Sequence, residues 1–385
     1  MNMKKLSSFL LTLVLIFSMT GPFSACADET DAIPEEAVMA KAVVLLSLDT
    51  GEVIYAKNEN EHLSPASVTK IMTILLVLEA LEEESIHLTD TVTASAEAVS
   101  MGGSQIWLEE GEQMTVDELF KAIVVASAND ACTALAEYIG GSTTGFVKMM
   151  NDRASALGLK NTHFENCNGL DDTVTNHYSS AYDLAVIARE VMRHELITDY
   201  TQIWLDHLRD GKTELNNTNK LVNPSTGITG LKTGTTSNAG FCVAATAERD
   251  GMSLVAVVLG AETSEQRFDT AVNLLDYGFA TYQLFVPELD ETQITTVTVK
   301  QGKVKTVKPV AAADESILIK KGAEEITYQY QVKDTVDAPV NAGDVLGEIV
   351  IMSGDREIGN IDLTAPESVE KVDLADILLL MILNI

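Results

Sequence analysis

Short apolar segments near both ends of the first domain predict the strands of one sheet. Segments 43–48 and 53–56 flank an Asp-Thr-Gly turn signal, which is the pattern of a β-hairpin. Segments 241–247 and 254–259 are separated by a second turn signal, Arg-Asp-Gly, and predict two more neighbouring strands. The chain thus begins and ends this domain with strands.

Helical periodicity fills the stretch between these strands. Residues 67–82 are apolar on nearly every side, which indicates a central, buried helix. Thr115 and Glu118 form a capping-box pattern that begins a second helix, and this helix ends near Ser127. Residues 158–179, rich in Gly, Asn and Asp, predict an extended loop. The other predicted helices cover residues 129–140, 144–157, 180–194 and 264–284.

Strands that bracket a block of helices indicate an α/β (α+β) domain over residues 36–285, with helices packed on a sheet. From Pro287 the pattern changes to short alternating segments punctuated by glycine. We expect residues 287–367 to form a small, β-sandwich-like all-β domain. A length of 385 residues is sufficient for two domains of these sizes.

The first 27 residues have the pattern of a secretory signal peptide. Lys4 and Lys5 precede the apolar run 9–17, and Ala25-Cys26-Ala27 matches an A-x-A cleavage site. The apolar run is short for a transmembrane anchor. Cys26 as a lipidated first residue stays open as an alternative. We therefore expect an exported protein of the cell envelope, at the outer face of the cytoplasmic membrane or outside the cell.

The amino-acid composition limits the kinds of ligand and partner that we expect. The net charge of −31 argues against nucleic-acid binding, which needs a basic surface. Beyond the signal, three cysteines remain, an odd number that does not indicate a disulfide framework. Free buried thiols are the simpler interpretation, and no Cys or His cluster suggests a metal or cofactor. Those cysteines are Cys132, Cys167 and Cys242.

Ser67 and Lys70 form an S-x-x-K pattern at the start of the predicted helix 67–82. Residues three apart share a helix face, so Lys70 is placed to act as general base on the Ser67 hydroxyl. Lys70 can take a proton only when neutral, and both burial and a second cation at Lys232 would lower its pKa. The alternative is a capping serine followed by a surface lysine, which two further motifs argue against.

The second motif is Ser127-Ala128-Asn129, at the junction of two predicted helices. We expect Ser127 to relay a proton to a leaving amine. Asn129 offers both a donor and an acceptor, which suits a substrate amide and Lys70 together. Ordinary capping of the helix that follows Ser127 is an alternative interpretation, and it is compatible with the roles expected for both residues.

The third motif, Lys232-Thr233-Gly234, precedes the strand 241–247. Lys232 is a point charge for a substrate carboxylate, helped by the hydroxyls of Thr233 or Thr235. Gly234 is expected to let a substrate backbone lie close to the strand edge. The alternative for Lys232 is a solvated lysine on a strand.

The segment from Pro65 to Thr73 resembles the nucleophile signature of the low-molecular-mass penicillin-binding proteins, the D-alanyl-D-alanine carboxypeptidases of the SxxK acyltransferase family. Ser127-Ala128-Asn129-Asp130-Ala131 and Leu231-Lys232-Thr233-Gly234-Thr235 lie where that family has its second and third motifs. The resemblance implies a penicillin-binding/β-lactamase-like domain with a five-stranded antiparallel sheet flanked by helices, and a C-terminal β-domain. It places the active site between sheet and helices.

The resemblance also implies roles for single positions. The family pattern places the oxyanion between the backbone N–H groups of Ser67 and Thr235. The family has an arginine at the position of Arg267, for which we expect a salt bridge on the helix surface. The family often has His where Asn168 stands, so no role is assigned there.

The activity implied is a serine-type D-Ala-D-Ala carboxypeptidase that removes the terminal D-alanine from peptidoglycan stem pentapeptides through a Ser67 acyl-enzyme. Such an enzyme is acylated by penicillin and other β-lactam antibiotics, and serves peptidoglycan biosynthesis, cell-wall maturation and cell shape. Added endopeptidase or transpeptidase activity stays open. A class A β-lactamase is disfavoured because Gly169, not Asn, stands four residues after Glu165. A penicillin sensor would need transmembrane helices.

Residues 368–385 form a tail whose last ten residues are apolar and lack Lys and Arg. The family often ends in a basic amphipathic helix, from which we expect peripheral membrane contact of this tail. The apolar run is too short to span a bilayer. Docking on the protein itself, or a frayed end, stays open.

Overall fold

The computed structural model describes residues 33–172, 174–222, 226–311, 316–322 and 325–373. The predicted signal peptide with Cys26, and the tail from residue 374 onward, lie outside these residues. Among the helices described, none is both long enough and apolar enough to cross a membrane.

One antiparallel sheet of five strands forms the centre of the first domain, in the order β2-β1-β9-β8-β7. It joins strands from both ends of the domain, as the apolar pattern predicted. β7 lies at one edge, so one side of this strand has no neighbouring strand among the residues that the structure describes. The strands are β1 (Ala42–Ser47), β2 (Val53–Lys57), β7 (Ile228–Thr236), β8 (Gly240–Arg249) and β9 (Met252–Ala261).

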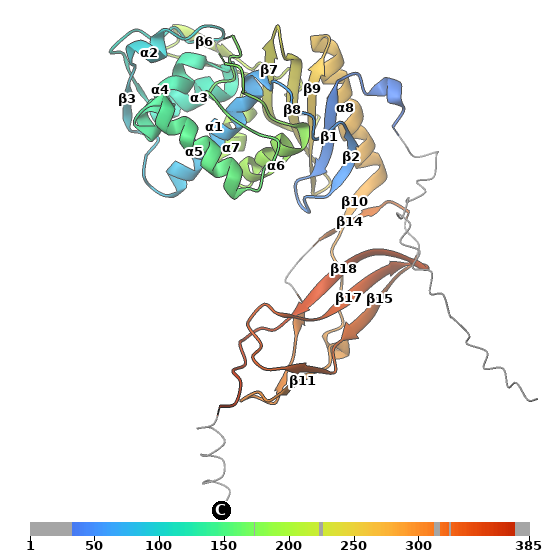
Figure 1. The fold of residues 1–385 in the computed structure, drawn as a ribbon. Helices are drawn as coiled ribbons and strands as arrows, with labels where there is room; N and C mark the ends of the chain where they lie inside the picture. The colour runs from blue at the N-terminus through green and yellow to red at the C-terminus, as the bar shows by residue number, and fades with distance from the viewer. Residues whose placement is uncertain (1–32, 173, 223–225, 312–315, 323–324, 374–385) are drawn as a thin grey trace, which may run out of the picture. The chain divides into compact units, whose positions relative to one another are not determined.

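Helices cover both faces of this sheet (Figure 1). Along β1 the side chains of Val44 and Leu46 belong to one apolar core, whereas Val43 and Leu45 belong to a second core on the other face. Successive strand residues point to opposite faces, so burial on both sides explains why β1 reads as an uninterrupted apolar run. On the first face α1 (Lys70–Glu82) and α6 (Ala181–Met192) lie against the sheet, and α3 (Val116–Ala126), α4 (Asn129–Gly140) and α5 (Thr143–Ala156) pack around α1. The second face carries α8 (Ser264–Thr281).

The helix α1 is buried at ten of its thirteen positions, as its apolar sequence predicts. Its predicted start at Ser67 is corrected: residues Ala66–Thr69 form a 3₁₀ turn, η2, and the α-helix begins at Lys70. The positive φ of Ala66 (48°) bends the chain sharply at the first residue of this turn. The capping box of α3 is present, with Thr115 and Glu118 bonded reciprocally.

The sequence left six short elements unpredicted, because each is too short to show a period. α2 and α7 are brief helices beside the main block, and the other four are strands of two small hairpins. Their bounds are α2 (Ala96–Val99), α7 (Leu196–Thr201), β3 (Thr91–Thr93), β4 (Gln113–Thr115), β5 (Leu205–Leu208) and β6 (Thr213–Asn216).

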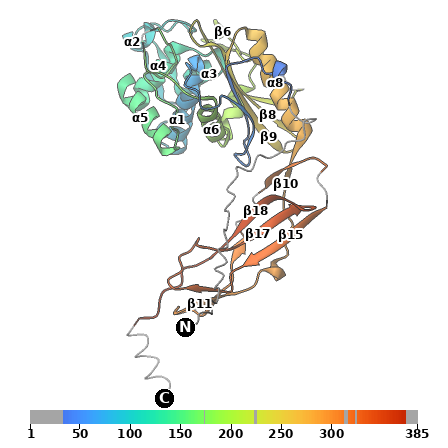
Figure 2. The ribbon, with the colours of Figure 1, turned by 45° about the vertical axis from the view of Figure 1, so that its right-hand side comes forward.

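After α8 the chain enters a β-rich module. The helix predicted for 264–284 ends at Thr281, and the next four residues instead form strand β10 (Tyr282–Phe285), paired with β14 (Ile317–Lys320). Two further sheets have the orders β12-β11-β16 and β13-β18-β17-β15. Figure 2 shows β18, β17 and β15 side by side. Their strands are β11 (Val297–Lys300), β12 (Thr306–Val307), β13 (Val310–Ala311), β15 (Ile326–Val332), β16 (Thr335–Asp337), β17 (Val345–Ser353) and β18 (Arg356–Thr364).

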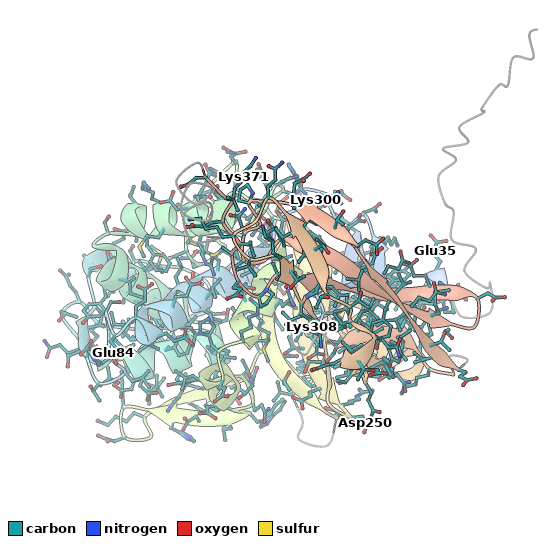
Figure 3. The ribbon with its side chains drawn as sticks, turned by 90° about the horizontal axis from the view of Figure 1, so that it is seen from below. Glu35, Glu84, Asp250, Lys300, Lys308 and Lys371 are labelled. Atoms are coloured by element: carbon teal, nitrogen blue, oxygen red, sulfur yellow. The ribbon has the colours of Figure 1, made fainter. Side chains whose placement is uncertain are left out.

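Charged side chains lie on the surfaces of both domains, in keeping with the large number of acidic residues in the chain (Figure 3). The labelled residues Glu35, Glu84 and Asp250 of the first domain and Lys300, Lys308 and Lys371 of the module are all exposed.

Candidate active site

Ser67 and Lys70 are brought together by the turn that precedes α1. Lys70 Nζ donates to Ser67 Oγ at 3.0 Å. The predicted contact is present, although Ser67 lies in the 3₁₀ turn η2 and not in the α-helix. In a 3₁₀ turn residues three apart eclipse one another, so the S-x-x-K spacing still aligns the two side chains.

Lys70 is completely buried, and three oxygen atoms surround its ammonium group. Besides Ser67 Oγ, it donates to Asn129 Oδ1 at 2.6 Å and to the backbone oxygen of Asn168 at 2.8 Å. Burial disfavours the charged form and lowers the pKa of Lys70 to about 8. A neutral amine in contact with Ser67 Oγ is therefore accessible near neutral pH.

The second motif forms the corner between α3 and α4. Ser127 adopts a left-handed conformation (φ 61°) at the end of α3, and its Oγ is buried without a hydrogen-bond partner among the described residues. Asn129 is fixed by its neighbours: its backbone N–H donates to Ser104 O and its Nδ2 to Gly102 O, each at 2.7 Å. These bonds leave Asn129 Oδ1 directed at Lys70.

The third motif lies on the edge strand β7. Lys232 is only 1% exposed, which excludes the solvated strand lysine, and its Nζ donates to Thr233 O at 3.1 Å. Burial holds the pKa of Lys232 well below its usual value, and the positive charges of Lys70 and Arg267 lower it further. Burial is the largest cause at both lysines, and the predicted effect of Lys232 is not among the causes of the lowered pKa of Lys70.

Gly234 allows a close approach between two parts of the protein itself. A Cβ at this position would lie 2.8 Å from Pro65 O, 2.8 Å from Ser67 N and 2.9 Å from Val68 N. The missing side chain therefore makes room for the protein's own turn η2, and the approach of a substrate backbone to this strand edge stays a prediction. This close approach brings the third motif against the backbone of Ser67.

The predicted salt bridge of Arg267 on the helix surface is wrong. Arg267 is buried, and its Nη1 donates to Gly234 O (3.1 Å), Thr235 Oγ1 (2.9 Å) and Cys242 O (3.2 Å). It lies in the first turn of α8, which faces the end of β7, so its side chain points inward. Arg267 thus holds Thr235 from behind.

Sequence reasoning missed Asp171, which ties three parts of the site together. Asp171 Oδ2 accepts from Ser64 Oγ (2.9 Å) and from Thr236 Oγ1 (2.6 Å). Ser64 lies three residues before Ser67, and Thr236 follows Thr235. Asp171 itself lies three residues after Asn168, whose carbonyl contacts Lys70.

His177 was also missed. Its Nδ1 accepts from the backbone N–H of Glu165 (3.0 Å), so the ring proton lies on Nε2, which donates to Thr69 Oγ1 at 2.8 Å. Burial lowers the pKa of His177 to about 4 and keeps the ring neutral. Glu165, in turn, accepts from the backbone N–H groups of Thr175 and Asn176, which holds the loop closed on itself.

The three cysteines, Cys132, Cys167 and Cys242, are free and buried, as the odd count indicated. Within the described ranges no three or more His, Cys, Asp or Glu side chains are gathered in a way that would hold a metal ion.

Comparison with known proteins places this geometry in a family. The profile of the D-alanyl-D-alanine carboxypeptidase family (Peptidase_S11) matches residues 28–263, and that of the penicillin-binding protein 5 C-terminal domain matches residues 282–371. The chain is 41% identical to D-alanyl-D-alanine carboxypeptidase DacF of Bacillus subtilis over 96% of its own length and 95% of that protein.

Comparison with solved structures points to the same family. Penicillin-binding protein 5 from Haemophilus influenzae is 33% identical, with a TM-score of 0.79 over 87% of this chain and 98% of that one. Penicillin-binding protein D2 from Listeria monocytogenes, solved in its ampicillin-bound form, is 30% identical, with a TM-score of 0.59 over 64% of this chain and 100% of that one. The chain belongs to the D-alanyl-D-alanine carboxypeptidase family of low-molecular-mass penicillin-binding proteins.

Proposed function

We propose that this D-alanyl-D-alanine carboxypeptidase removes the terminal D-alanine from peptidoglycan stem pentapeptides through an ester to Ser67. The observation that carries the proposal is the buried Lys70 ammonium at 3.0 Å from Ser67 Oγ. A buried lysine with a lowered pKa is the base that a serine hydroxyl needs when no histidine contacts it.

In the proposed acylation step Ser67 Oγ forms a bond to the carbonyl carbon of the penultimate D-alanine, and Lys70 Nζ takes the hydroxyl proton. The C–N bond to the terminal D-alanine then breaks, and the leaving amine receives a proton. Water attacks the resulting ester, which releases the shortened peptide and restores the Ser67 hydroxyl. Lys70 passes the proton taken from Ser67 on to the leaving amine in the first half of the cycle; in the second half it takes a proton from the attacking water and returns it to Ser67 Oγ.

Ser127 suits the transfer of that proton to the leaving amine. Its buried Oγ has no partner among the described residues, and a buried hydroxyl normally has one, so an incoming amine would complete its bonding. Asn129 Oδ1 steadies Lys70, and we assign its amide to contact with the substrate peptide. In the second motif, Ser127 is therefore proposed as the proton relay and Asn129 as a substrate-binding residue.

Lys232, Thr233 and Thr235 are proposed to hold the terminal carboxylate. Lys232 is a buried cation whose Nζ contacts only a carbonyl oxygen among the described residues, so a carboxylate would supply the missing negative charge. Binding of that anion raises the pKa of Lys232 toward its ordinary value and fixes its charge. Arg267 orients Thr235 from behind.

The oxyanion of the tetrahedral intermediate is proposed to lie between the backbone N–H groups of Ser67 and Thr235. The absence of a side chain at Gly234 supports this pairing, because it lets β7 approach the Ser67 backbone closely. Each such donor contributes about 3 kcal/mol to transition-state stabilisation. We further propose that penicillin and other β-lactams acylate the same Ser67 Oγ.

The test is D-alanine release from a peptidoglycan pentapeptide by the chain without residues 1–27, compared with its Ser67→Ala variant. Ser100→Ala is a matched control, because Ser100 is exposed. We expect release and covalent labelling by a fluorescent penicillin from the parent and the control, and neither from Ser67→Ala. Labelling that survives in Ser67→Ala would exclude Ser67 as the nucleophile.

We also propose export to the cell envelope, directed by residues 1–27, and peripheral membrane contact by residues 368–385. The charged start, apolar run and A-x-A site support the first, and the apolar tail supports the second. Fractionation of cells that express the full chain or a chain ending at residue 373 separates the two: loss of the tail should release the protein from membranes without preventing export.

A further inference from the structure

Trp107 is an exposed aromatic residue on a strained backbone. Its side chain is 74% exposed, more than any other large apolar side chain found exposed in the described part of the chain. Its φ is +58°, a left-handed conformation that a bulky side chain avoids. Such strain costs about 1–3 kcal/mol and persists only where the surroundings impose it.

Buried groups on both sides impose this conformation. The fully buried carboxylate of Asp130 accepts from the backbone N–H groups of Ile106 and Leu108, each at 3.1 Å. Arg209 Nη1 donates to Ile106 O at 2.8 Å. The side chains of Ile106 and Leu108 are themselves buried. Thus the residues before and after Trp107 are anchored, while its indole is held out in solvent.

The same segment is attached to the proposed active site. Ser104 O and Gly102 O accept from the backbone and side chain of Asn129, whose Oδ1 contacts Lys70. Gly103 lies against the Asn129 amide, where a Cβ would come within 2.8 Å of Nδ2. Two neighbouring residues therefore connect the two places: Asn129 positions the catalytic lysine, and Asp130 positions the indole.

We propose that Trp107 is a stacking platform for a sugar ring of the glycan that carries the stem peptide. This inference rests on the function proposed above and names a second part of the substrate. An indole offers a flat apolar face to the C–H groups of a pyranose and an N–H donor at its edge for a hydroxyl or acetamido oxygen. Rigid, exposed tryptophans are typical anchors of binding surfaces.

A stem peptide is long enough to span the segment between Gly103 and Trp107. Four residues separate the scissile bond from the sugar end of a stem pentapeptide, a span of at most about 14 Å. Four residues also separate Gly103, which contacts Asn129, from Trp107, with the same upper limit.

The charge of the segment favours a neutral sugar over an anionic ligand. Residues 102–113 contain Glu109, Glu110 and Glu112 and no Lys or Arg. Arg209, the cation that contacts this segment, is paired with Glu112 at 2.6 Å. Anionic lipid head groups and phosphate polymers are therefore repelled from the indole, whereas hydroxyl and acetamido groups are accepted.

The first test compares free pentapeptide with disaccharide-linked pentapeptide as substrates of the mature chain. Trp107→Gly removes the indole and suits the positive φ, so the variant is expected to fold with an unchanged or higher melting temperature. We expect KM for the disaccharide-linked substrate to rise about tenfold and KM for the free peptide to stay the same. Trp204→Ala, at the chain's other exposed tryptophan, is the control and should change neither value.

Equal KM values for the parent and Trp107→Gly on the disaccharide-linked substrate would overturn the proposal. An equal rise on both substrates would also overturn it, because the indole would then act on the peptide. Release of D-alanine from neither substrate by the parent would count against the proposed function instead.

A second test needs no turnover. Trp107 and Trp204 are the only tryptophans, so Trp204→Phe leaves Trp107 as the single indole reporter. Titration of this variant with the neutral N-acetylated disaccharide diacetylchitobiose should shift or quench its emission saturably, and maltose should not. An unchanged emission up to tens of millimolar disaccharide would overturn the platform even if the enzyme is active.

Discussion

The first domain and the β-rich module bury different kinds of side chain. Between sheet and helices the first domain buries three cations, Lys70, Lys232 and Arg267. In the described residues from 287 onward, the buried side chains are apolar, and Ile349 and Ile351 of β17 lie in one such core. The module follows the ordinary rule of apolar inside and charged outside, and the first domain breaks that rule at its site.

This difference in buried side chains shows where the protein loses folding stability in exchange for catalytic groups. A buried ammonium costs several kcal/mol of desolvation unless well placed oxygen atoms surround it. Lys70 has three such oxygens, whereas Lys232 has one among the described residues. The buried cations of the site therefore lower the stability of the first domain, and the described part of the module has no comparable cost.

The largest expected effect is on the pH dependence of catalysis. The pKa of Lys70 is about 8, and its protonated form has no lone pair to accept the Ser67 proton. We expect kcat/KM for D-alanine release to fall about tenfold for each pH unit below 8, or about 1000-fold down to pH 5. Lys70→Arg, which stays protonated, should be inactive at every pH. A flat profile would remove Lys70 as the base.

The next effect in size separates stability from activity at Lys232. In Lys232→Met the carboxylate loses its counter-charge, so we expect kcat/KM to fall about 100-fold. The buried charge is lost as well, so the melting temperature should rise by about 2–4 °C, which corresponds to about 1 kcal/mol. Lys300→Met, at an exposed lysine of the module, is the control and should change neither quantity. A fall in melting temperature would mean that this lysine stabilises the fold.

A smaller effect is expected at Asp171, whose carboxylate joins Ser64 and Thr236. Asp171→Ala should loosen the loop that presents Asn168 O to Lys70, and we expect kcat to fall about tenfold. Weaker bonding of the ammonium should also move the acid limb of the pH profile to lower pH, which a general loss of stability would not do. Asp172→Ala, at the exposed neighbour, should match the parent.

The smallest effect on activity is expected in the module. Ile349→Ala on β17 should destabilise the module by about 2–5 kcal/mol and leave kcat on free pentapeptide unchanged. Ile74→Ala on α1, with the same burial and the same substitution, should reduce both stability and activity. Calorimetry and D-alanine release on the two variants test this contrast, which fails if Ile349→Ala loses activity.

Periodicity and short motifs allow several elements and the main site residues to be predicted from the sequence. The hairpin of β1 and β2 and the buried helix α1 follow from their apolar patterns, and the three motifs meet at one site as the family resemblance implied. The predicted helix 67–82 wrongly includes residues of the turn η2. A 3₁₀ turn and an α-helix share the spacing that places Ser67 beside Lys70, so the pattern does not distinguish them. Spacing alone therefore identifies the pair without giving its exact backbone.

The rest of the site depends on contacts between distant parts of the chain. Asp171 bonds to residues 107 and 65 positions away, and His177 to Thr69, 108 positions away, from a loop without any period. Arg267 reads as a solvated residue at the start of a helix, yet the sheet edge in front of it buries its guanidinium. Such placements follow from topology, which local sequence does not specify.

The close packing of Gly234 against η2 has an evolutionary consequence. Any side chain at this position would push against the backbone of Ser67 and displace the nucleophile itself. Substitution at this position is therefore closed as a route to resistance, because a side chain that narrows the site for an inhibitor also displaces the nucleophile that the enzyme needs.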